Sequence, residues 1–67
     1  MNHTLIREQR LHLDLTLRQV AEECGVSAST IHLLEIGEIK YEVPDYLYEL
    51  CRVLEIDPEK LLERGEQ

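Results

Sequence analysis

Histidine and cysteine are the side chains of this sequence that could act as metal ligands or as nucleophiles. The histidines are His3, His12 and His32, and no two of them stand four residues apart, as two ligands on one helix face would. Neither Cys24 nor Cys51 has a second cysteine at the short spacing of a zinc site. The sequence therefore predicts no metal site.

The two cysteines fall inside apolar, helix-like patterns. This placement predicts buried free thiols that pack as small hydrophobic groups. A disulfide between Cys24 and Cys51 is the alternative interpretation.

Catalysis has little support. The sequence contains no glycine-rich phosphate loop, no serine–histidine–aspartate set in a supporting context, and no cysteine activated by a nearby histidine. A helical chain of 67 residues also leaves little room for a ligand pocket of about 300 Å³. We therefore expect a protein that is not an enzyme, with no catalytic residues and no cofactor.

The composition is that of one folded domain, expected over residues 1–67, because 43% of the residues are hydrophobic and 31% are charged. No apolar run approaches the roughly 18 residues of a membrane helix, and the N-terminus lacks the pattern of a signal peptide. We expect a cytoplasmic protein without membrane contact. The net charge of −7 opposes binding to a polyanion, because it repels phosphates at long range.

Residues that begin and end helices divide the chain into five short helices. The first is expected over Thr4 to His12. Thr16 and Gln19 then have the spacing of a capping box, and Gly25 ends the helix that they open. A third helix, over about 28–36, begins after a Ser27 cap.

Two further helices follow a connection over 38–43. Pro44 suits the first turn of the fourth, whose core-facing stripe has helical spacing: Leu47, Leu50, Cys51 and Leu54. The pair Asp57-Pro58 opens the fifth. A competing pattern is the alternation of Leu11, Leu13, Leu15 and Leu17 with polar residues, which is typical of a strand.

The segment from about 16 to 37 predicts two helices that cross at a tight turn. Ala21 is small, as the close approach of two helices requires, and Gly25 makes the turn. Val26 is suited to fill the angle between the helices, while Ile31 and Leu34 anchor the second helix to the core.

In this register the segment resembles the helix-turn-helix of the lambda repressor/Cro superfamily, also called the Xre family. The similarity covers about residues 5–63, including a fourth-helix pattern over 50–57. The resemblance implies an all-α, five-helix, lambda-repressor-like domain. Its helix over about 28–36 would enter the DNA major groove, while the preceding helix lies across the backbone. It also implies a structural ion pair between Arg10 and Glu35.

On this resemblance, the expected function is a sequence-specific DNA-binding regulator of transcription, acting as a homodimer on double-stranded DNA. Hydroxyl, imidazole and methyl groups are suited to base edges, whereas cations and the first turn of a helix are suited to phosphates. The candidate DNA contacts are Thr16, Arg18, Ser27, Ala28, Ser29, Thr30, His32, Leu33 and Lys40.

Several positions that commonly hold DNA in the family are apolar or acidic here. They include Leu17, Leu33, Ile36 and Glu38. The alternative function is therefore a protein-interaction or dimerisation module on the same fold, with weak or no DNA binding. Its interface would be an exposed apolar patch with an acidic rim. The patch residues are Leu17, Leu33, Ile36 and Ile39, and the rim residues are Glu38, Glu42 and Asp45. The alternative is that some of the patch residues pack against the first or the fourth helix, with burial expected for Ile39 and exposure for Leu33.

Overall fold

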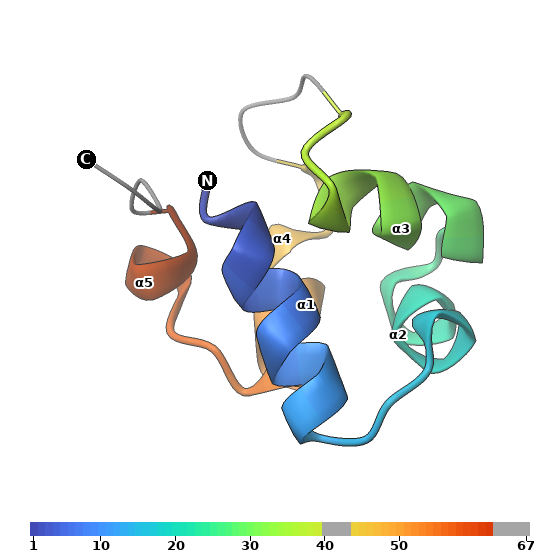
Figure 1. Cartoon of the computed structure of the whole chain (residues 1–67), viewed down its shortest axis with the longest axis horizontal. Coiled ribbons are helices and arrows are strands. Elements are labelled where there is room, and N and C mark those ends of the chain that lie inside the picture. Colours follow the sequence, from blue (N-terminus) through green and yellow to red (C-terminus); the bar gives the residue numbers. More distant parts are fainter. Residues whose placement is uncertain (40–43, 63–67) are drawn as a thin grey trace.

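The computed structural model describes residues 1–39 and 44–62, and within them it contains five helices and no strand. The helices are α1 (His3–His12), α2 (Leu17–Cys24), α3 (Ala28–Glu35), α4 (Leu47–Leu54) and α5 (Pro58–Leu62). Figure 1 shows the α2–α3 pair on one side of α1, α5 on the other, and α4 behind α1. The expected all-α class is confirmed.

Local hydrogen bonds explain where α2 and α3 begin. The Thr16 hydroxyl accepts from the Gln19 backbone N–H at 3.0 Å, and the Gln19 side chain accepts from the Thr16 N–H at 2.8 Å. Ser27 caps α3 in the same way, accepting from the Thr30 N–H at 3.2 Å. These caps satisfy N–H groups that have no partner within a helix.

One expectation about a single segment requires correction. Pro44 does not lie in the first turn of α4, because its carbonyl accepts from the Leu47 N–H at 3.1 Å in a turn that precedes the helix. The competing strand-like alternation does not form a strand, and the segment instead contains the end of one helix, a turn and the start of the next. Leu11 lies in α1 and is exposed, Asp14 has a left-handed φ of 61°, and Leu17 begins α2.

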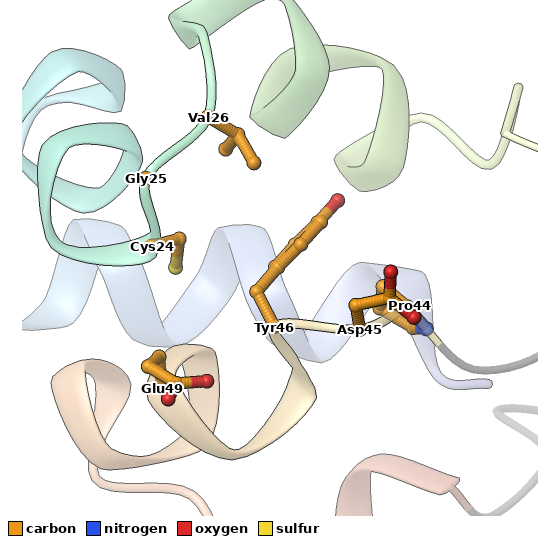
Figure 2. A pocket seen from close by; sticks show the side chains of 7 residues that line it. All are labelled: Cys24, Gly25, Val26, Pro44, Asp45, Tyr46 and Glu49. Atoms are coloured by element: carbon orange, nitrogen blue, oxygen red, sulfur yellow. The ribbon is translucent and has the colours of Figure 1, made fainter.

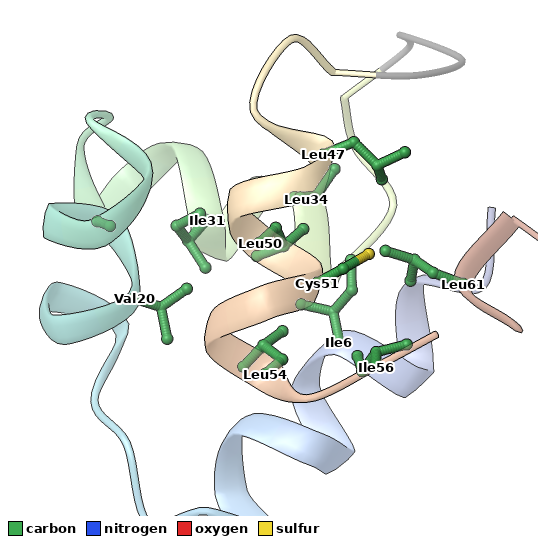
Figure 3. Close-up of a cluster of buried hydrophobic side chains, with 11 residues drawn as sticks. Ile6, Val20, Ile31, Leu34, Leu47, Leu50, Cys51, Leu54, Ile56 and Leu61 are labelled. Atoms are coloured by element: carbon green, nitrogen blue, oxygen red, sulfur yellow. The ribbon is translucent and has the colours of Figure 1, made fainter. Parts of the chain in front are cut away.

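The hydrophobic core gathers side chains from all five helices around α4 (Figure 3). The expected stripe of α4 is buried in full, and Ala21 is buried on α2. The core residues are Ile6, Val20, Ala21, Ile31, Leu34, Leu47, Leu50, Cys51, Leu54, Ile56 and Leu61.

Cys51 is buried and Cys24 is half-buried, and both thiols are free. Within the described parts of the chain, no set of three or more histidine, cysteine or acidic residues is arranged to hold a metal ion. None of the helices found there is both long enough and apolar enough to cross a membrane.

Candidate nucleic-acid interface

The turn between α2 and α3 fixes how these two helices cross. Gly25 ends α2 with a φ of +72°. Residues that have a Cβ adopt this left-handed backbone conformation only at a cost in free energy. The Val26 N–H then donates to the Ala21 carbonyl at 3.0 Å, which closes the turn. A Cβ on Gly25 would meet nothing within 4 Å, so glycine is required here by backbone conformation and not by space.

A buried ion pair fastens α3 to α1. Arg10 Nε lies 2.6 Å from Glu35 Oε2, and Arg10 Nη2 lies 3.2 Å from Glu35 Oε1. Arg10 Nη1 also donates to the Leu15 carbonyl at 3.0 Å. The side chains of Arg10 and Glu35 are only 11% and 2% exposed. Because water cannot solvate these charges, each is stabilised by its partner. Arg10 thus links α1, α3 and the segment that leads into α2.

A second tether at the end of α3 was not predicted from the sequence. The Nδ1 atom of His3 lies 2.7 Å from the Leu34 carbonyl, the arrangement of an imidazole N–H donating to it. The Asn2 N–H donates to the Leu61 carbonyl at 2.7 Å, and the Asn2 side chain caps α1. The first residues therefore connect α1 to both α3 and α5.

The exposed face of α3 combines three of the predicted contacts. Ser29, His32 and Leu33 are all exposed, and their spacing of three and four residues places them on one side of the helix. Ile36, just beyond the helix, continues this line and is 52% exposed. The face is therefore polar toward the N-terminus of α3 and apolar toward its C-terminus.

Other predicted contacts are already engaged in the fold. The hydroxyls of Thr16 and Ser27 serve as caps, and the Ser27 and Thr30 hydroxyls lie 2.9 Å apart in a hydrogen bond. Thr30 and Ala28 are half-buried. The three hydroxyls hold the starts of α2 and α3 in place, and Ala28 packs against the core, so these side chains offer less to a ligand than those of the exposed face.

Arg18 projects from the first turn of α2 with its side chain 85% exposed. It lies 3.6 Å (Nε to Oε2) from Glu22 one turn along, so a phosphate would compete with this carboxylate for the guanidinium. The sequence pattern did not single out Glu22 for this role, although its spacing of four residues from Arg18 is a recognisable signal. Lys40, together with Glu42 of the expected acidic rim, lies outside the described residues.

The candidate apolar patch consists of two exposed residues and two that are half-buried. Leu33 and Ile36 are 41% and 52% exposed, but Leu17 and Ile39 are half-buried. The reason is that Leu17 and Ile39 pack against the buried core. The rim residues Glu38 and Asp45 are exposed.

The expectation that the chain has little room for a pocket is also wrong. An open pocket of about 670 Å³ lies between the α2–α3 turn and the start of α4 (Figure 2). Cys24 lines it, and burial together with the negative charge of Glu49 raises the pKa of this thiol to about 11. A thiol with so high a pKa is a poor nucleophile at neutral pH.

Comparison with known proteins gives one family. Residues 4–64, which include nearly all of the five helices, match the family described as a helix-turn-helix domain. No curated protein matches the chain. The matched range contains the crossed pair α2–α3, the Arg10–Glu35 ion pair and the exposed face of α3.

Proposed function

Because the chain belongs to the helix-turn-helix domain family, we propose that it is a sequence-specific DNA-binding regulator of transcription that reads the major groove with α3. The observation that carries the proposal is the exposed face of α3 formed by Ser29, His32 and Leu33. Hydroxyl and imidazole groups can hydrogen-bond to base edges, and an apolar side chain can pack on a thymine methyl.

Phosphate contacts on this surface are few. The described residues offer Arg18 and the exposed first turn of α2, where Thr16 stands as the cap. Two to four phosphate contacts per subunit would give a logarithmic salt slope of about −2 to −4. A homodimer on a near-palindromic site would make twice as many phosphate contacts, which is the reason to propose a dimer.

The test is fluorescence anisotropy of a labelled duplex taken from upstream of the protein's own gene, with a scrambled duplex beside it. The titration is run at about 50 and 200 mM salt. The proposal expects preference for the native duplex and weaker binding at higher salt. Equal affinity for both duplexes, or no binding at the lower salt, would contradict it.

A double variant identifies the reading face. Replacing Ser29 and His32 by alanine removes two groups that reach base edges, so affinity for the native duplex should fall by about tenfold or more. His12→Ala is the matched control, because it removes an exposed histidine from α1 instead of α3. A loss of the same size in the control would contradict the assignment to α3.

A specific observation also favours the second candidate, a protein-interaction or dimerisation module. Leu33 and Ile36 are large apolar side chains exposed next to each other along the α3 face. If they form an interface between copies, Leu33→Glu should convert a dimer to a monomer in sedimentation analysis. Leu62→Glu is the control, since Leu62 is 42% exposed on α5. A wild-type protein that is already monomeric would contradict an interface between copies at Leu33 and Ile36.

A further inference from the structure

The open pocket between the α2–α3 turn and α4, here called the elbow pocket, has a lining that the proposed DNA contacts do not use. Its residues are Cys24, Gly25, Val26, Pro44, Asp45, Tyr46 and Glu49. Figure 2 shows the Tyr46 side chain rising between the turn at Val26 and the Pro44–Asp45 segment, with Glu49 on the following turn of α4. The elbow pocket is thus formed by two segments about 20 residues apart in the sequence.

The inner wall of the elbow pocket is largely apolar. Val26, Cys24 and Tyr46 are half-buried and pack against the hydrophobic core, and Pro44 is buried. Such a wall favours an aliphatic or aromatic group over a fully hydrated ion.

Its outer rim is acidic. Asp45 and Glu49 are both exposed, and none of the described lining residues is basic. The negative charge of Glu49 reaches the wall, because it contributes to the raised pKa of Cys24. Arg52 offsets this in part, but it lies 4.0 Å (Nη2 to Oε1) from Glu23 on α2.

An apolar wall beneath a pair of carboxylates matches one kind of side chain, namely an aliphatic stem that ends in a cation. Arginine fits better than lysine, because its planar guanidinium can pair with a carboxylate and also stack on an aromatic ring such as that of Tyr46. The same rim repels phosphate, so nucleic acid is a poor occupant. The net charge of −7 would also speed the approach of a basic partner.

We propose that the elbow pocket is a docking site for a basic segment of a partner protein, with an arginine side chain seated against Tyr46 and paired with the carboxylate of Glu49, while Asp45 adds negative charge to the rim. The proposal does not depend on DNA binding by α3. It gives the chain a second surface, formed by other residues than the α3 face.

The test is a titration of the full chain, labelled with nitrogen-15, with a short capped alanine peptide that carries one central arginine. Matched peptides carry glutamine or lysine at the same place. The arginine peptide should shift the amide signals of residues 24–26 and 45–49, the lysine peptide should bind more weakly, and the glutamine peptide should cause no shift. Equal shifts from the arginine and glutamine peptides, or none from either, would overturn the proposal.

Charge-matched variants separate the elbow pocket from general attraction to an acidic protein. Glu49→Gln should weaken binding of the arginine peptide by about threefold, as expected for the loss of one exposed charge pair. Glu59→Gln on α5 makes the same change in net charge away from the elbow pocket and should leave binding unchanged. Since both side chains are exposed, both variants should fold. Equal weakening by the two would overturn the proposal.

Discussion

Where α1 meets α3, two opposite charges are enclosed with almost no contact with water. Arg10 and Glu35 satisfy each other through two hydrogen bonds, and Arg10 adds a third to the Leu15 carbonyl. Removing one partner of such a pair leaves a buried charge without compensation, which costs about 3–5 kcal/mol. A domain of this size has a total stability of similar magnitude, about 3–5 kcal/mol.

Arg10→Met is therefore expected to unfold most of the protein at room temperature. The double variant Arg10→Met, Glu35→Leu should recover much of the stability, because an apolar pair of similar volume leaves no orphan charge. Urea unfolding followed by circular dichroism measures both. A single variant as stable as the double variant would show that the ion pair is not needed for the fold.

The thiol of Cys24 gives a pH dependence of stability. Its pKa is raised by burial and by Glu49 from 9.0 to about 11. The folded state therefore holds this proton more tightly than the unfolded chain does. The resulting stabilisation is fully present below pH 9 and is lost as the pH rises through 11.

Cys24→Ala should accordingly reduce the fall in the urea midpoint between about pH 8 and pH 11. It should not abolish the fall, because burial and Asp57 also raise the pKa of Cys51. Urea titrations of the variant and the wild type at matched pH values make the comparison. The same fall in both proteins would mean that the Cys24 thiol does not titrate in this way.

At the scale of the elements, the turn between α2 and α3 depends on one backbone conformation. A Cβ at position 25 would have open space around it, but the backbone of the residue must keep a left-handed φ. Gly25→Ala should therefore destabilise the fold by about 1 kcal/mol. Gly25→Asn should cost less, because asparagine tolerates this conformation better. Thermal unfolding ranks the variants, and an alanine variant as stable as wild type would place the requirement elsewhere.

Sequence reasoning predicted the elements best where the cause is local. The Thr16–Gln19 capping box and the Gly25 turn involve residues at most a few positions apart, so their spacing is visible in the sequence. Pro44 is an exception, because it also suits the turn that precedes α4.

Contacts between residues far apart in the sequence could not be predicted from the periodicity of apolar residues. The hydrogen bond from His3 to the Leu34 carbonyl joins residues 31 positions apart, and nothing local marks either partner. The pairing of Arg10 with Glu35 was implied by a family resemblance and not by spacing. The half-burial of Leu17 depends on how the start of α2 sits against the core, which its spacing in the sequence does not determine. The elbow pocket was missed for the same reason, since it exists only where two segments meet.

For the whole molecule, the net charge of −7 is a weaker obstacle to DNA binding than its size indicates. At physiological salt an exposed charge is largely screened beyond about 8 Å, so acidic residues far from a bound phosphate contribute little. Glu22 is different, because it lies 3.6 Å from Arg18, the exposed cation of the α2 first turn. A DNA phosphate must therefore replace the Glu22 carboxylate as the ion-pair partner of the Arg18 guanidinium.

For the proposed DNA binding, Glu22→Gln should therefore raise affinity about twofold to fivefold at low salt, the value of one exposed ion pair. The gain should shrink as salt is added. Glu59→Gln is the control, because it changes the net charge equally from α5. Anisotropy titrations of both variants decide between two physical cases. A gain in Glu22→Gln alone means that local charges around Arg18 set the affinity, whereas equal gains in both would mean that the total charge does.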